Sequence, residues 1–157
     1  MDPSASETPR KARRQDTSLE SEGAEFLVLG NLLVEGIVAH KTYTNNPGYD
    51  LVAIDPERGT SARIQVKSRW RTGAEGFIIK NFDTDFVVVA LLNRGSKDGK
   101  REIAPPEFYV LPAEEVRAAS AAYQNAWGKL PLGRIPGFKD RLSDWGAIRA
   151  FLQREAR

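Results

Sequence analysis

The chain has 157 residues, of which 41% are hydrophobic and 28% charged, as expected of a globular domain with a sizeable core. It has no cysteine and one histidine, His40, which excludes a disulfide scaffold and a thiolate metal site and disfavours a histidine-rich zinc site. No apolar run reaches membrane-spanning length and the N-terminus has no apolar signal core, so we expect a cytoplasmic protein. The formal net charge of +2 does not by itself indicate nucleic-acid binding.

The chain begins with a polar segment that is followed by a helical pattern. Residues 1–17 are rich in Ser, Thr, Pro and charged side chains, so we predict a disordered N-terminal tail that is dispensable for folding. Residues 18–157 are expected to form one domain with a C-terminal helical extension. Ser18 or Ser21 is the expected cap of a helix that ends near Gly36. Because this helix is apolar nearly all round, we expect it to be buried against a sheet.

Short β-branched runs come next, separated by turn residues. Strands are predicted at 37–44, 49–55, 61–70, 77–80, 82–93 and 107–112, and helices at 113–127 and 142–156. The run at 82–93 is apolar on both faces, which is typical of the most buried strand. Residues 128–138 are expected to be irregular. This order of elements predicts an α/β fold with a mixed sheet.

The predicted strand at 61–70 has one polar face. Side chains two residues apart point the same way in a strand, so Arg63, Gln65, Lys67 and Arg69 share a face. If this strand pairs with 49–55 as a hairpin, Asp50 joins Gln65 and Lys67 there. A carboxylate and further oxygen donors can hold Mg²⁺, and a neighbouring lysine can orient or deprotonate a water molecule. The pattern therefore predicts parts of a phosphodiester hydrolase.

A helix acid adds to this set. Glu25 stands four residues before Leu29, in line with the apolar stripe of the first predicted helix. A carboxylate on an apolar stripe needs a partner to offset its desolvation. Glu22, closer to the exposed helix start, is the weaker candidate.

The stretch from Glu22 to Pro112 resembles the PD-(D/E)xK nuclease superfamily, the fold of many restriction enzymes, Holliday-junction resolvases and some homing endonucleases. The resemblance rests on "GAEFLVLGNLLVEGIVAHKTYTNNPGYDLVAID", "ARIQVKSR" and the later pair "DFVVVALL" and "FYVLP". It implies a restriction-endonuclease-like α-β-β-β-α-β core with a mixed central sheet flanked by helices. Two departures are visible: Gly48 and Tyr49 stand where the motif often has proline, and Gln65 replaces the usual acid, as in a QxK variant.

The resemblance also implies roles for individual residues in a Mg²⁺- or Mn²⁺-dependent DNA endonuclease. The implied metal ligands are Asp50, Gln65, Glu25 and the Val66 carbonyl. Lys67 would position the attacking water. The residues implied to contact nucleic acid are Arg63, Arg69, Arg71, Asn45 and Asn46. A homodimer is expected by resemblance only.

The same residues also fit interpretations other than a nuclease site. Gln65 and Lys67 also fit an ordinary solvated strand face, and Asp50 fits a strand-start acid that binds backbone amides. Asn45 and Asn46 also fit a simple turn. At the level of function, the rivals are an inactive nuclease-fold module that binds nucleic acid or a protein partner, and a nuclease that acts on RNA.

Overall fold

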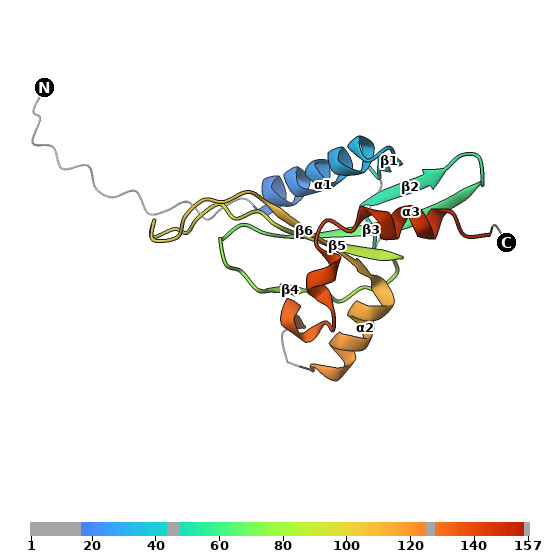
Figure 1. Cartoon of the computed structure of the whole chain (residues 1–157). Helices are drawn as coiled ribbons and strands as arrows, with labels where there is room; N and C mark the ends of the chain where they lie inside the picture. The colour runs from blue at the N-terminus through green and yellow to red at the C-terminus, as the bar shows by residue number, and fades with distance from the viewer. Residues whose placement is uncertain (1–16, 44–47, 125–127, 156–157) are drawn as a thin grey trace, which may run out of the picture.

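A computed structural model describes residues 17–43, 48–124 and 128–155 (Figure 1). The predicted tail up to residue 16, Asn45 and Asn46 lie outside this described part. The elements in chain order are α1 (Thr17–Val34), β1 (Val38–Lys41), β2 (Leu51–Asp55), β3 (Thr60–Arg69), β4 (Gly76–Ile78), β5 (Phe86–Leu91), β6 (Glu107–Pro112), α2 (Ala113–Ala122), β7 (Lys129–Pro131), two short 3₁₀ turns at Leu132–Arg134 and Phe138–Arg141, and α3 (Trp145–Leu152). Within the described residues, no helix combines the length and the apolarity that a membrane crossing requires.

The first helix ends as its sequence predicts. Gly36 has φ +78°, and the N–H groups of Gly36 and Ile37 donate to the carbonyls of Leu33 and Leu32. This is a Schellman motif, which stops a helix at a glycine in the left-handed conformation. At the other end α1 begins at Thr17, one residue before the expected cap.

The burial of α1 differs from the expectation of a helix enclosed on all sides. Ala24, Val28 and Leu32 are buried against the sheet, whereas apolar side chains on the opposite face, including Phe26 and Leu33, are exposed. The reason is that the sheet covers only one face of the helix, so apolar residues all round leave one stripe uncovered.

The central sheet is mixed and has the strand order β1-β2-β3-β5-β6. The β1–β2, β2–β3 and β5–β6 pairs are antiparallel, and β3 and β5 are parallel. Leu51 pairs with Ile64 across the β2–β3 hairpin, and Gln65 pairs with Val87 in the parallel pair. The predicted mixed α/β fold is therefore confirmed, and β3 is its central strand.

The connection from β3 to β5 contains a strand where the resemblance implied a helix. Its strand β4 pairs antiparallel with β7, which lies in the segment expected to be irregular. Phe77 and Ile79 are buried while Ile78 between them is exposed, and this period of two suits a strand. Gly73, with φ +80°, opens the segment with a turn that a helix could not contain.

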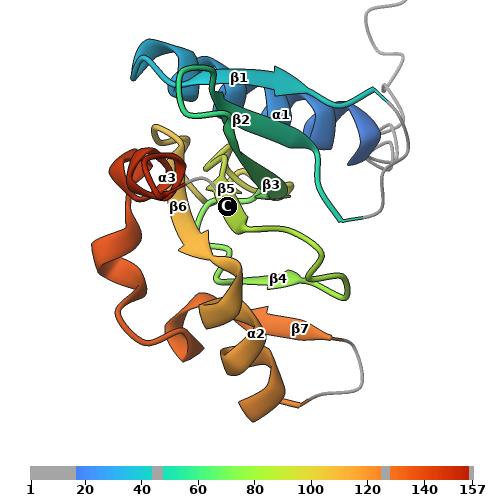
Figure 2. The same ribbon diagram turned by 90° about the vertical axis from the view of Figure 1, so that its right-hand side faces the viewer.

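Hydrophobic residues pack on both faces of the sheet, in two clusters. One lies under α1 and α3 and includes Ile64, Val88 and Trp145. The other lies under α2 and the β4–β7 pair and includes Val87 and Val89. Figure 2 shows α1 on one side of the sheet and β4, β7 and α2 on the other. Since Gln65 and Lys67 pair with Val87 and Val89, they belong to the second face.

Candidate active site

The β2–β3 hairpin places Asp50 beside the polar face of β3. The Asp50 N–H donates to the Ile64 carbonyl at 2.8 Å, although Ile64 is the partner of the next residue, Leu51, so the pairing shifts by one residue at this end of the hairpin. Asp50 Oδ2 accepts a hydrogen bond of 2.8 Å from the Val66 N–H. The carboxylate is thus fixed against the backbone of the strand that carries Gln65 and Lys67.

Gln65 is an unusual residue for a central strand because it is a buried amide without a complete set of partners. It is 8% exposed, and among the described residues its Oε1 atom has no hydrogen-bond donor. A buried acceptor left unsatisfied costs about 1–3 kcal/mol. The fold therefore holds a desolvated oxygen on the strand against which the Asp50 carboxylate is fixed, and a cation could satisfy it.

Lys67 follows Gln65 on the same face of β3. Burial lowers the pKa of the Lys67 ammonium, and attraction to Asp50 opposes this effect in part. A lysine with a lowered pKa releases its proton more readily than an exposed lysine does.

Glu25 reaches Asp50 from α1, which covers the opposite face of the sheet from Gln65 and Lys67. Burial raises the pKa of Glu25, repulsion from Asp50 raises it further, and Lys41 opposes both. Lys41 Nζ lies 3.2 Å from Glu25 Oε2 and 2.7 Å from Glu22 Oε1, and the Lys41 side chain is only 8% exposed. A carboxyl group whose ionisation is opposed by a neighbouring carboxylate is a place where a cation is favourable.

The direction of the Glu25 shift predicts a pH-dependent gain in stability for Glu25→Gln in metal-free buffer. With the folded pKa above 4.5, the stability that Glu25 contributes is fully present below 4.5 and is lost as pH rises through the folded pKa. We therefore expect the variant to melt at a higher temperature than wild type at pH 7, with a smaller difference at pH 4. Melting curves in EDTA at both pH values measure this, and a Glu25→Gln protein less stable than wild type at pH 7 would contradict it.

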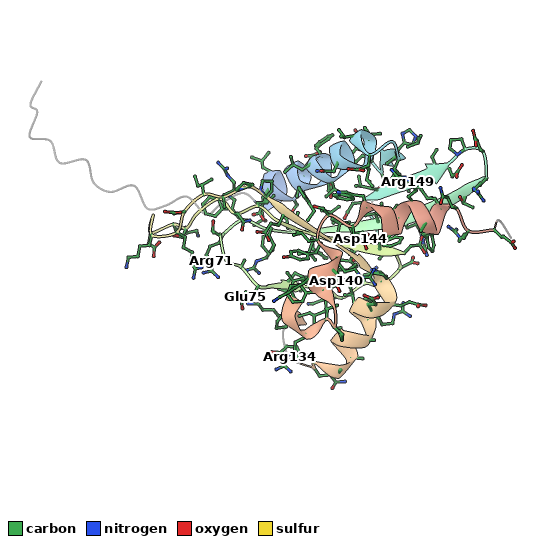
Figure 3. All side chains as sticks on the ribbon, in the orientation of Figure 1. Arg71, Glu75, Arg134, Asp140, Asp144 and Arg149 are labelled. Carbon is green, nitrogen blue, oxygen red and sulfur yellow. The ribbon has the colours of Figure 1, made fainter. Side chains whose placement is uncertain are left out.

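A basic surface begins where β3 ends. Arg69 and Arg71 line a depression of about 650 Å³ together with Trp70, Lys97 and Arg101. Lys97 and Arg101 come from the β5–β6 connection, which projects from the sheet as an arm (Figure 1). Within the described residues, the guanidinium groups of Arg69 and Arg71 form no hydrogen bond or ion pair. Figure 3 shows Arg71 on the segment that leaves β3 towards β4.

Arg63, at the other end of β3, lies in a different environment. Its guanidinium group pairs with Asp83 at 2.6 Å and with Asp85 at 3.5 Å, and Asp85 Oδ2 also accepts the Arg63 N–H. These contacts fasten the connection before β5 to β3. Asn45 and Asn46, the other predicted nucleic-acid contacts, lie outside the described residues.

The donor set at the site suits a hard cation. Glu25 and Asp50 supply carboxylates and Gln65 an amide oxygen, and oxygen ligands are those that Mg²⁺ prefers. The described residues contain no cluster of three or more His, Cys, Asp or Glu side chains of the kind that holds a metal ion without other donors.

Sequence reasoning missed Lys41, Lys97 and Arg101. Lys41 stands on β1, and its place beside Glu25 depends on the β1–β2 register, which pairs Lys41 with Leu51 next to Asp50. The alternation of side chains along β1 could have indicated this position of Lys41, but only if the pairing of β1 with β2 had been known. Lys97 and Arg101 belong to a segment whose composition indicated no more than an exposed loop.

No protein-family model matches the sequence, and neither does any curated protein sequence. The structure nevertheless has a mixed α/β fold that is shared with a solved structure. It is similar to that of the bacterial homing endonuclease I-Ssp6803I, with a TM-score of 0.54 and 21% sequence identity, over 88% of this chain and 92% of that one. At this identity the similarity shows a shared fold, and the chemistry has to be argued from the site.

Proposed function

We propose that the protein is a DNA endonuclease of the PD-(D/E)xK type, in its QxK variant, that hydrolyses phosphodiester bonds with Mg²⁺ or Mn²⁺. The observation that carries this proposal is the buried Oε1 of Gln65, which has no hydrogen-bond partner among the described residues, on the strand against which the Asp50 carboxylate is fixed. An ordinary solvated strand face would expose this amide to water, and here it is enclosed. The shared fold with a homing endonuclease supports the same assignment and favours DNA as the substrate.

Each residue of the site has a distinct task in this proposal. Asp50, Glu25, the Gln65 amide and the Val66 carbonyl hold the cation. When bound, the cation polarises the phosphate and lowers the pKa of a water molecule. Lys67 positions the attacking water and takes up its proton, a task that its lowered pKa favours. Lys41 favours the ionised form of Glu25 and orients its carboxylate through the 3.2 Å ion pair.

Gln65 supplies the test of the metal site. Gln65→Leu keeps a similar volume and removes the unpartnered oxygen, so we expect the metal-free protein to become more stable by about 1–3 kcal/mol. The same change should lower the affinity for Mg²⁺ and Mn²⁺ because one donor is lost. Gln65→Glu adds a charge and should raise that affinity. Chemical denaturation in EDTA and calorimetric titration with each metal measure the two effects.

The control is Thr84→Val, a change at another buried polar residue, which hydrogen-bonds the Arg63 and Phe86 carbonyls away from the site. It should lose stability and leave metal affinity unchanged. If neither Gln65 variant alters metal affinity, Gln65 does not face a metal and the proposal is wrong.

The basic surface at the end of β3 is proposed to bind the DNA backbone, because phosphate contacts dominate the affinity of proteins for DNA. Arg69 follows Lys67 on the same strand face, about 7 Å further along. The guanidinium groups of Arg69 and Arg71, which have no partner in the described part of the chain, lie further along from the site, and Lys97 and Arg101 extend the same surface along the arm.

Arg69→Ala and Arg71→Ala should each weaken DNA binding similarly for all sequences and reduce the slope of log K against log salt by about 1. The matched control is Arg58→Ala, at the hairpin tip before the opposite end of β3, where the side chain is 51% exposed. DNA binding measured by fluorescence anisotropy over a series of salt concentrations should distinguish the Arg69 and Arg71 variants from the Arg58 control. An Arg58 variant that lost as much affinity as the Arg69 and Arg71 variants would place the DNA elsewhere.

A further inference from the structure

The outward face of α1 is apolar without interruption. Opposite the buried residues, about a third of the helix circumference carries only apolar side chains and glycine. These residues, named here the outer stripe, are Leu19, Gly23, Phe26, Leu27, Gly30, Leu33 and Val34. Their large side chains are 45–87% exposed, and half of the large exposed hydrophobic residues in the described part of the chain lie on this one helix. A soluble helix that is apolar on both faces normally has a partner on each.

The spacing within the outer stripe is that of a helix–helix contact. Leu19, Gly23, Phe26, Gly30 and Leu33 follow one another at intervals of four, three, four and three residues, so large side chains alternate with glycines along one seam. This pattern offers knobs next to holes. It would let a second helix approach closely at the two glycines.

The described part of the chain gives no reason for Gly23 and Gly30. Neither has a positive φ, and a Cβ atom built at either position would meet nothing within 4 Å. Glycine inside a helix costs roughly 0.5–1 kcal/mol relative to alanine. Two such residues on one exposed seam therefore indicate that something beyond the described residues approaches there.

The charges on α1 favour a second copy in the antiparallel orientation. The helix carries Glu20, Glu22 and Glu25 in its N-terminal half and no basic residue. A parallel pair would set these acids side by side, whereas an antiparallel pair separates them and aligns the helix dipoles favourably. It also brings the acidic end of one copy towards the end of the other at which Arg149 donates to the Glu35 carbonyl.

The area is sufficient for a specific dimer. The exposed apolar side chains of the outer stripe amount to roughly 500 Å² per copy, so two copies reach about 1,000 Å², the lower limit for a specific interface. The stripe also continues into an apolar depression of about 640 Å³, which Leu19, Gly23 and Leu27 share with Trp70, Leu92 and Pro106.

We propose that the outer stripe of α1 is a self-association surface, on which α1 of a second copy packs antiparallel about a twofold axis near Phe26. The proposal rests on the exposed apolar face, the glycine spacing and the distribution of charge, and it does not depend on the proposed nuclease activity.

Sedimentation equilibrium from low to high micromolar concentration tests the surface. We expect wild type to dimerise, and Leu33→Gln and Gly30→Gln each to weaken dimerisation by about tenfold or more. Gly30→Gln is the sharper change, because the position is open and glutamine favours helix more than glycine does, so the monomer should fold at least as stably. Ile78→Thr, at a residue 50% exposed on β4, is the matched control and should leave dimerisation unchanged.

The orientation is tested by cross-linking, which is simple because the chain has no cysteine. In an antiparallel pair, Leu27→Cys lies near the twofold axis and should form an intermolecular disulfide under mild oxidation, whereas Val34→Cys should not. Cross-linking at both positions would overturn the antiparallel arrangement. The proposal would be overturned by a wild-type protein that stays monomeric at all concentrations. It would also be overturned by a dimer whose stability neither Leu33→Gln nor Gly30→Gln changes. A monomeric wild type would mean that a different protein binds the outer stripe.

Discussion

Lys67→Ala is expected to reduce metal-dependent DNA cleavage by about 10²–10⁴-fold, the usual contribution of a positioned proton-transfer group. Lys67 lies on the polar face of β3, and its pKa is lowered by burial next to Asp50. Alanine at this position can neither orient water nor accept its proton. Single-turnover cleavage of a labelled duplex at saturating Mg²⁺ measures the chemical step directly.

Two further measurements show whether a loss of cleavage in Lys67→Ala comes from the chemical step. The half-buried Lys67 side chain stands outside the apolar clusters, so the unfolding free energy should change by no more than roughly 1 kcal/mol. Metal affinity should not fall, because a cation is removed from the site. A Lys67→Ala protein that is folded, binds metal and cleaves at the wild-type rate would remove Lys67 from the mechanism.

Asp50→Asn is expected to abolish metal binding and reduce cleavage by about 10³-fold or more, because one of two carboxylates at a cation site is neutralised. Asparagine retains an oxygen that can accept the Val66 N–H, so the hairpin should keep its geometry. The loss would therefore report charge and ligation, with the fold preserved.

The pKa values of Glu25 and Lys67 provide a second measurement of the effect of Asp50→Asn, and this measurement requires no enzymatic activity. Repulsion from Asp50 raises the pKa of Glu25, and attraction to Asp50 opposes the lowering of the pKa of Lys67. In Asp50→Asn both pKa values should therefore fall, and NMR titration of the two side chains would measure them. Unchanged values for both would mean that the three residues do not share a site.

Much of the fold could be predicted because its local patterns agree with its tertiary structure. The period-two alternation of β3, the turn before it and the continuous apolar run of β5 each predict the observed strand. The sequence also predicted a strand at the position of β4, but it did not predict the partner strand β7. β7 is only three residues long and contains a proline, so its pairing depends on contacts distant in sequence.

The candidate site was predictable only as far as the β2–β3 hairpin extends. Asp50, Gln65 and Lys67 are linked by one turn, so strand register alone brings them together. The place of Lys41 depends on a second pairing and on the packing of α1. The burial of the Gln65 amide depends on the layer formed by β4, β7 and α2, and no pattern within β3 distinguishes that amide from a solvated one.

Cleavage of supercoiled plasmid with Mg²⁺ or Mn²⁺ tests the central claim most directly. We expect wild type to convert the plasmid to nicked and linear forms in the presence of either metal, and to leave it intact in EDTA. A Lys67→Ala protein prepared in the same way should leave the plasmid intact in every condition, which excludes a contaminating nuclease. Plasmid that stays supercoiled with wild type and both metals, or cleavage that Lys67→Ala retains, would contradict the assignment of this site as a metal-dependent nuclease centre.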